Sequence, residues 1–300
     1  MRITHQMLNQ TAIDGMQANM RRLADIQKQA VTTKRVLRPE DDPFAVEQSL
    51  GFRARLQNGE AVLHNASMSS DWLNATDKAL SDVGDILIRT QDLALRGANE
   101  TQGPDERQSL ATEVEGLLEQ AVALGNSRHG DHYLFSGFQI DSPAFSINRD
   151  PTTRSITSVN YDGDTGQIIR EVEPSVNMAI NVQGDSAFSS IFSTLLDLRN
   201  DLQTTPFVVG DVNAKVTDLK NQMTDLFDLQ AGVGTKIRRL ETTTSRVEAA
   251  QVGLQELLSK AEDADMAEVI SQLNQQQFAY EAALQVNAKT LNMSLLDFLR

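Results

Sequence analysis

The chain has 300 residues and no cysteine, which excludes disulfide bonds and thiolate chemistry. Its formal net charge of -14 and its lack of lysine- or arginine-rich runs argue against a nucleic-acid partner. No apolar run reaches about 18 residues, and the N-terminus lacks the apolar core of a cleaved signal peptide. We therefore expect no membrane span. Export by a route that leaves the N-terminus uncut stays open.

Residues 2–30 are predicted to form an amphipathic helix with a thin apolar stripe. The stripe consists of Ile3, Met7, Ile13, Met16, Met20, Leu23 and Ile26. So few apolar side chains leave an isolated helix marginal in water. Two interpretations stay open: a frayed terminus docked on a bundle, or a segment that becomes ordered only against a partner.

Residues 32–41 break the helical pattern and are predicted to be a linker. Pro39 and Pro43 bracket three acidic residues, and Asp42 is placed to cap a helix that begins at Pro43. Neighbouring carboxylates could also serve a metal or acid–base site. The position directly before a helix favours the capped helix start.

Heptad patterns predict a coiled-coil bundle built from residues 42–135 and 207–262. Residues 43–98 carry leucines at seven-residue spacing, with a register slip between Leu63 and Leu73 beside Trp72, the only tryptophan. A shorter helix follows, and residues 212–258 hold one register over roughly six heptads. The predicted bundle core consists of Leu73, Leu80, Leu87, Leu219, Leu226, Ile237, Leu240 and Leu254.

Residues 136–206 are predicted to form a small, mainly-β domain inserted between the long helices. Alternating apolar residues on either side of residues 162–166 (Asp-Gly-Asp-Thr-Gly) predict a hairpin with a glycine-bearing turn. A calcium loop is disfavoured because its downstream ligands are missing. The helix seams do not pass through the insert, so we expect the bundle to fold without residues 138–186.

Motifs that carry chemistry are missing from the sequence. His129 and His132 lie close together, but two ligands without a third are a weak metal signal. The sequence contains no nucleophile elbow, no phosphate-binding glycine loop and no cysteine–histidine pair. It therefore predicts no metal, no cofactor and no enzymatic activity.

Residues 264–300 are predicted to form a second terminal helix, which begins at Met266 and pairs with residues 1–31 in an inner terminal domain. The apolar positions assigned to its stripe are Ile270, Leu273, Tyr280, Leu284, Leu291, Leu295 and Phe298. The predicted order is therefore palindromic: terminal helix, break, long helices, β insert, long helix, break, terminal helix. This order predicts that the chain runs out, turns in the β domain and returns beside itself.

The palindrome and several short motifs together resemble the flagellin superfamily. The motifs are residues 1–4 (Met-Arg-Ile-Thr), 37–43 (Leu-Arg-Pro-Glu-Asp-Asp-Pro), 132–137 (His-Tyr-Leu-Phe-Ser-Gly), 263–268 (Asp-Ala-Asp-Met-Ala-Glu), 275–277 (Gln-Gln-Gln) and 294–299 (Ser-Leu-Leu-Asp-Phe-Leu). Leu37 and Glu40 depart from the Ser-Arg-Pro-Ser-Asp-Asp-Pro pattern of the similar members. The resemblance covers the helical part, and residues 138–206 match only in general character.

The resemblance implies a structural subunit of the bacterial flagellum, in a layer between hook and filament and outside the cell. Its implied partners are the first hook-associated protein on the hook side, flagellin on the filament side, further copies of itself and a flagellar export chaperone. The implied export route is the flagellar type III system. Flagellin itself, which usually carries Asn-Ser-Ala-x-Asp-Asp-Ala in place of residues 38–43, and a soluble coiled-coil adapter are the alternatives.

Two sets of residues are assigned to assembly on this basis. The expected subunit joint consists of Arg38, Pro39, Asp41, Asp42 and Pro43. The stripe of the last helix is expected to bind the chaperone first, with its apolar face in a groove, and neighbouring subunits later. The competing interpretation is a hairpin of the two terminal helices that is stable without help.

Overall fold

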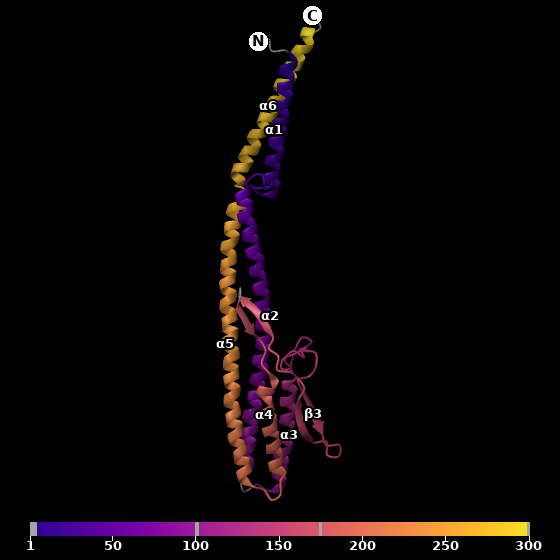
Figure 1. Ribbon diagram of the computed structural model, residues 1–300, viewed down its shortest axis with the longest axis vertical. Coiled ribbons are helices and arrows are strands. Elements are labelled where there is room, and N and C mark those ends of the chain that lie inside the picture. Colours follow the sequence, from indigo (N-terminus) through magenta and orange to yellow (C-terminus); the bar gives the residue numbers. More distant parts are fainter. Residues whose placement is uncertain (1–4, 100–101, 174–175, 299–300) are drawn as a thin grey trace. The chain divides into compact units, whose positions relative to one another are not determined.

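The computed structural model describes residues 5–99, 102–173 and 176–298, without the side chains of residues 5, 6, 8, 9 and 289–298. Its helices are α1 (His5–Thr32), α2 (Pro43–Gly97), α3 (Pro104–Gly125), α4 (Gly184–Gln203), α5 (Val209–Glu262) and α6 (Met266–Phe298), as Figure 1 shows. Its strands are β1 (Arg128–His129), β2 (His132–Tyr133), β3 (Phe145–Arg149), β4 (Ile156–Tyr161), β5 (Ile169–Glu173) and β6 (Val176–Ala179). The predicted fold class, mainly α with a small inserted β region, is confirmed.

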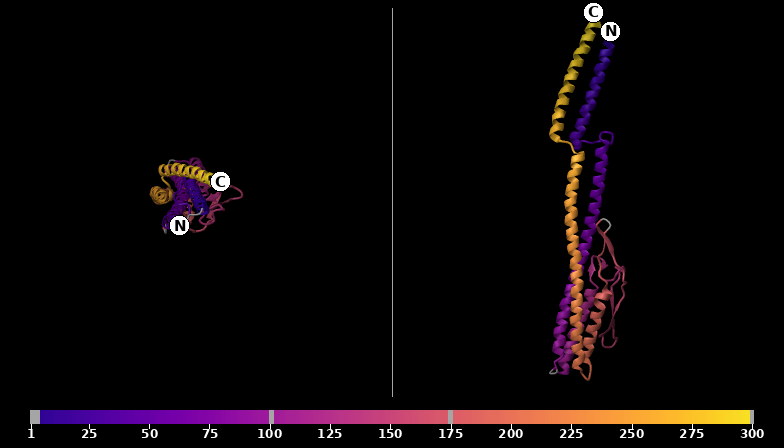
Figure 2. Two further views of the ribbon diagram at one scale, coloured as in Figure 1. Left: turned by 90° about the horizontal axis from the view of Figure 1, so that it is seen from above. Right: turned by 60° about the vertical axis from the view of Figure 1, so that its left-hand side comes forward.

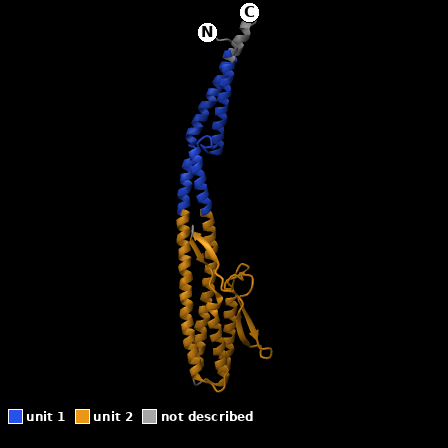
Figure 3. Ribbon diagram, viewed as in Figure 1, with its two compact units in different colours: residues 1–58, 249–300 blue, residues 59–248 orange. Residues whose placement is uncertain are grey.

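The chain forms two compact units (Figure 3). Unit 1 contains residues 1–58 and 249–300, and unit 2 contains residues 59–248. Both limits fall inside α2 and α5, because these long helices contribute residues to each unit. The domains predicted from sequence instead have their limits at the breaks between helices. They follow the secondary structure and differ from the two compact units.

In unit 1, α1 and α6 lie side by side in both views (Figures 1 and 2) and run antiparallel. The Nε2 of Gln276 lies 3.3 Å from the carbonyl oxygen of Asn19, and the Nδ2 of Asn287 lies 3.4 Å from that of Ala12. Positions therefore pair in reverse order along the two helices. The two helices α1 and α6 therefore form an antiparallel pair, which we call the terminal hairpin although the rest of the chain connects them.

Unit 2 is a bundle of α3, α4 and parts of α2 and α5. Of the eight predicted core residues, Leu73, Leu80, Leu87, Leu219, Leu226 and Leu240 are buried to at least 99%. Ile237 is half-buried in unit 2, and Leu254, which belongs to unit 1, is also half-buried. The leucines lie at heptad spacing, so one continuous stripe of each long helix faces the core.

The predicted hairpin on either side of residues 162–166 is wrong. β4 pairs with β3, and β5 pairs with β6, each time antiparallel. The chain leaves β4 because Asp164 Oδ1 accepts hydrogen bonds from the backbone N–H groups of Phe138 (2.8 Å) and Gly166 (2.7 Å). Gly137 has φ 72°, and a Cβ there would collide with Asp164. This contact anchors the turn to a distant loop instead of closing a hairpin.

The expectation that the bundle is independent of residues 138–186 conflicts with the packing. Strands and helices share one hydrophobic core, in which Ile156 is fully buried. The backbone N–H of Ile156 donates to Glu115 Oε1 of α3 at 2.9 Å. Phe145 of β3 packs edge-on against Phe192 of α4, with ring centroids 4.9 Å apart. Removing the insert would therefore expose part of the bundle core to water.

The buried leucines generate a test in which two leucines of α2 are compared. Leu80 is fully buried and Leu95 is 51% exposed. We expect Leu80→Ala to lower the free energy of unfolding by about 2–5 kcal/mol through lost burial and a cavity, and Leu95→Ala to change it by less than about 0.5 kcal/mol. Urea unfolding followed by Trp72 fluorescence measures both. Equal effects of the two substitutions would contradict this core.

Candidate functional site

The two breaks between helices meet in unit 1 and form what we call the joint, residues 33–42 and 261–265. Residues 34 and 263 form an isolated antiparallel bridge, and the backbone N–H of Ala264 donates to the carbonyl oxygen of Thr33 at 2.9 Å. Thr33 has φ 58°, a left-handed conformation that is uncommon for a β-branched residue. Backbone hydrogen bonds from the distant break hold it there.

A buried carboxylate, that of Glu262, lies at the centre of the joint. Its Oε1 is 2.5 Å from Lys34 Nζ and its Oε2 is 2.5 Å from Arg53 Nη2, while the side chain itself is 8% exposed. Lys34 Nζ also contacts Asp263 Oδ1 at 2.6 Å. The end of a helix carries partial negative charge, which disfavours a carboxylate there. The two cations offset both this repulsion and the loss of solvent.

The joint depends on ionisation at both ends of the pH scale. Hydrogen bonds to Asp263 and then Glu262 raise the pKa of Lys34 above its ordinary 10.5, and the hydrogen bond from Lys34 lowers the pKa of Asp263 below its ordinary 3.8. The lysine contribution to stability is complete below pH 10.5 and is lost as pH rises through the raised pKa. The Asp263 contribution is present above pH 3.8 and is lost as pH falls through the lowered pKa.

The predicted helix cap at Asp42 is confirmed. Its Oδ1 accepts a hydrogen bond from the backbone N–H of Ala45 at 3.0 Å, and this bond is the main cause that lowers the pKa of Asp42. Asp41 Oδ2 accepts from the backbone N–H of Arg38 at 2.8 Å. Both predicted joint carboxylates therefore have partners within the chain, whereas Arg38, Pro39 and Pro43 are exposed on the surface.

The faces that pair α1 with α6 differ from the stripe predicted for the last helix. We call the facing positions the seam: Ala12, Met16, Asn19, Leu23 and Ile26 on α1, with Val269, Leu273, Gln276, Tyr280, Ala283 and Asn287 on α6. Leu273 and Tyr280 belong to it as predicted, but Ile270 is 51% exposed and Leu284 is 41% exposed. The side chains of Leu291, Leu295 and Phe298 lie outside the described residues.

Apolar side chains remain uncovered on both terminal helices. We call the following six the outer residues: Met7 (63% exposed), Ile13 (47%), Met20 (51%), Ile270 (51%), Phe278 (76%) and Leu284 (41%). Meanwhile the seam places Gln276 and Asn287 against α1, and Val269 is its one buried member among the described side chains. The hairpin thus buries little apolar surface and exposes much, which is typical of a surface completed by a partner.

Two residues of the joint, Lys34 and Glu262, and their neighbour Arg53 of α2 escaped prediction from the sequence. A signal exists for one of them, because an acidic residue in the last turn of a helix is unfavourable without a cation nearby. The cations themselves lie 228 and 209 residues away from Glu262 in the chain. Their sequence neighbourhood therefore gives no indication of the pairing.

The described part of the chain lacks the features expected of a metal site and of a membrane span. No three potential metal ligands come together there, and no described helix has the length and apolar character to cross a membrane. His132 Nδ1 lies 3.2 Å from Asp141 Oδ1, and His129 contacts the Trp72 ring edge-on. The two histidines are cross-strand partners in the β1–β2 pair, but their side chains contact different neighbours.

Comparison with known proteins places both helical ends in one family. The family model of the bacterial flagellin N-terminal helical region matches residues 3–139, and that of the C-terminal helical region matches residues 216–299. Flagellar hook-associated protein 3 of Escherichia coli (strain K12) is 26% identical over 99% of both chains, and that of Salmonella typhimurium is 26% identical over 100% of both. Flagellins and filament core proteins match at 19–22% identity.

A solved structure shares the fold. Flagellar hook-associated protein 3 of Legionella pneumophila superposes with a TM-score of 0.61 at 16% identity, covering 70% of this chain and 97% of that one. At this identity the likeness concerns the fold alone. It extends the sequence relation, which spans the chain, to the arrangement of the elements.

The joint predicts a charge-dependent effect. Lys34→Ala with Arg53→Ala leaves the buried Glu262 carboxylate without a cation, and we expect the joint to lose about 1–3 kcal/mol, discounted because both cations are partly exposed. Amide hydrogen exchange of residues 258–266 measures the loss. Adding Glu262→Gln to this variant should restore most of the lost stability, because the buried side chain is then neutral. The matched control, Lys28→Ala with Arg55→Ala, removes the same charges from exposed sites and should have little effect.

The weak seam predicts unequal protection along the isolated chain. We expect backbone amides of α1 and α6 to exchange with solvent at least about tenfold faster than those of residues 79–94 in α2, because the terminal hairpin buries so little apolar surface. Hydrogen exchange with mass spectrometry measures both regions in the same sample. Equal protection would mean that the hairpin is stable without help.

Proposed function

Because this chain belongs to the flagellin family through both of its helical ends, we propose that it is the structural subunit between the hook and the filament of a bacterial flagellum. The observation that carries this proposal is the correspondence with flagellar hook-associated protein 3 over 99% of both chains, terminal helices included. The family's members are structural proteins of the flagellum. We therefore expect this chain to function through surfaces that bind other subunits and not through a chemical reaction.

Assembly would proceed through the terminal hairpin. The outer residues of α1 and α6 expose apolar surface that one chain does not cover, and neighbouring copies with the same hairpin can cover it. Burial of each large side chain contributes about 1.5–3 kcal/mol, so several together drive association. The seam then becomes the inner part of a larger helical layer, in which each hairpin contacts others.

The joint would set the direction in which the terminal hairpin begins. Glu262 holds its own helix end to Lys34 and to Arg53 of α2, so three separate segments are fixed at one point. Arg38, whose guanidinium contacts the exposed Glu40 at 3.0 Å, remains accessible for a neighbouring subunit together with Pro39 and Pro43. The carboxylates of Asp41 and Asp42 instead accept hydrogen bonds from backbone N–H groups of their own segment.

The proposed partners are the first hook-associated protein on the hook side, flagellin on the filament side and an export chaperone. The proposed chaperone site is the C-terminal helix, with Ile270, Leu273, Tyr280 and Leu284 and the further apolar residues toward the end. A marginal hairpin suits export through the flagellar type III channel, because an unfolded terminus costs little there. Chaperone and neighbouring subunits would then use the same face in turn.

Flagellin is the second candidate, since filament proteins match about nine-tenths of this chain. Two observations favour the junction subunit. The hook-associated proteins match at higher identity and over the whole length of both chains. Residues 37–43 also carry proline on both sides of three acidic residues, in place of the pattern usual in flagellin.

The outer residues provide the test. In a motile host that carries this gene, Ile270→Asp with Leu284→Asp should abolish filaments, because a charge would have to be buried at each contact. The matched control is Ile88→Asp with Leu95→Asp, two residues of α2 that are equally exposed (51% each) and should keep filaments. Electron microscopy of cells, with immunoblots of the medium for shed filament protein, measures the outcome.

Two results separate the candidates. Loss of a junction subunit leaves flagellin exported but unattached, so filament protein should accumulate in the medium of the variant. Loss of a flagellin would leave hooks with their caps and no filament protein outside. Attached filaments of normal length in the Ile270→Asp, Leu284→Asp strain would contradict the proposed assembly surface.

A further inference from the structure

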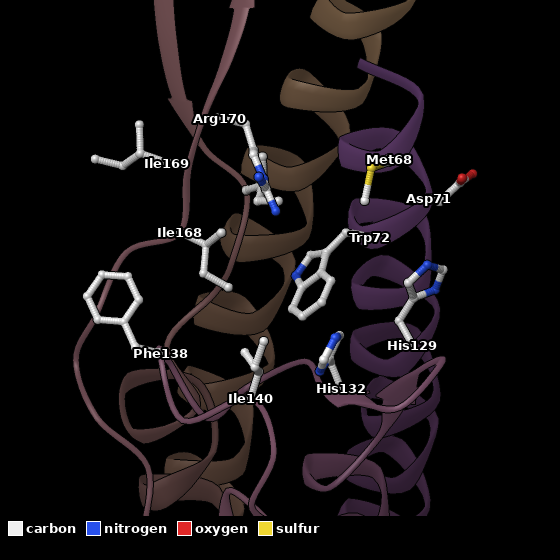
Figure 4. A pocket seen from close by; sticks show the side chains of 11 residues that line it. Met68, Asp71, Trp72, His129, His132, Phe138, Ile140, Ile168, Ile169 and Arg170 are labelled. Atoms are coloured by element: carbon white, nitrogen blue, oxygen red, sulfur yellow. The ribbon is translucent and has the colours of Figure 1, made fainter. Parts of the chain in front are cut away.

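Unit 2 contains a pocket of about 480 Å³ that the proposed assembly role does not use (Figure 4). Its walls include Met68 and Trp72 of α2, Ile140 and Ile168 from the insert, and Ile180. Small-molecule sites typically have volumes of about 300–1,000 Å³ and mostly apolar walls with a few polar groups. The pocket has this size and composition.

An indole N–H in the pocket wall has no partner. Trp72 is 8% exposed, and its Nε1 has no hydrogen-bond acceptor among the described residues. The ring meets His129 edge-on, with centroids 6.2 Å apart, and Figure 4 shows the nitrogen on the opposite side, toward Ile168 and Arg170. Buried donors are nearly always satisfied, so this N–H is available to donate to a bound molecule.

A second hydrogen-bond donor lines the same pocket. Arg170, on β5, is exposed and makes no ion pair within the described part of the chain. The carboxylate of Asp71, which also lines the pocket, points away from the indole in Figure 4. Guanidinium and indole groups only donate hydrogen bonds and cannot satisfy each other. A single carboxylate placed between Trp72 and Arg170 would accept from both.

We propose that this pocket binds a small amphipathic carboxylate. The apolar body of the ligand packs on Trp72, Ile140, Ile168 and Ile180, and its carboxylate accepts from Trp72 Nε1 and Arg170. A purely apolar ligand would leave the buried indole N–H unpaired. A strongly hydrated dianion would lose too much hydration free energy on entering a pocket lined by isoleucines. Because Nε1 is covered from solvent, binding requires a local shift of the pocket wall, after which the exposed Arg170 side chain closes on the carboxylate.

The sole tryptophan of the chain is itself the reporter for the first test. Titration of the full chain with 3-phenylpropionate should give a saturable change in Trp72 fluorescence. The matched neutral probe, 3-phenylpropanamide, has the same body and should bind at least about tenfold more weakly, because a charge-assisted hydrogen bond is replaced by a neutral one. No saturation below about 10 mM carboxylate, or equal binding of the two probes, would overturn the proposal.

Two variants assign the donors. Arg170→Ala should weaken 3-phenylpropionate about tenfold and leave 3-phenylpropanamide unchanged, whereas the control Arg239→Ala, also an exposed arginine of unit 2, should change neither. Trp72→Phe keeps an aromatic wall but removes the N–H. Calorimetry should then show about tenfold weaker carboxylate binding.

Every other pattern counts against the site. Carboxylate binding that survives either Arg170→Ala or Trp72→Phe would mean that the probe lies elsewhere. Circular dichroism confirms that each variant is folded before it is titrated. The experiment does not involve assembly, so its outcome is independent of whether the chain joins hook to filament.

Discussion

Glu262 is a buried carboxylate at the end of a helix, where the helix dipole and the loss of solvent both oppose it. Ion pairs with Lys34 and Arg53 offset these two costs. They also connect three segments of unit 1: the break after α1, the first part of α2 and the end of α5. Close to these ion pairs, the backbone N–H of Ala264 donates to the carbonyl oxygen of Thr33, which has a left-handed φ of 58°.

The terminal hairpin and the bundle distribute their apolar residues in opposite ways. In unit 2 the leucines of the heptads face inward and are fully buried, so a single chain can stabilise this unit. In the hairpin the seam includes Asn19, Gln276 and Asn287, while Phe278 and other large apolar side chains face outward. Such a hairpin buries little apolar surface within one chain, which agrees with the proposal that neighbouring copies complete it.

The insert is part of the bundle rather than an appendage to it. Glu115 links α3 to Ile156 of β4 and lies 3.4 Å from Arg199 of α4, a buried guanidinium. Phe145 fills the space between the β region and α4. The two-stranded sheets are too small to be stable alone, and each gains its buried face from the helices. The pocket at Trp72 exists because this packing leaves a gap between α2 and β5.

The sequence by itself determined the helices, their heptad stripes, the cap at Asp42 and the family, since these depend on local spacing and short motifs. The tertiary structure decided what local spacing leaves open. Heptads through Val269 and through Ile270 both run along α6. The structure selects the first as the seam, because Gln276 and Asn287 hydrogen-bond to α1 and Val269 is buried while Ile270 is exposed. Strand pairing and the partners of Glu262 were likewise beyond sequence reasoning, because they are set by contacts between residues far apart in the chain.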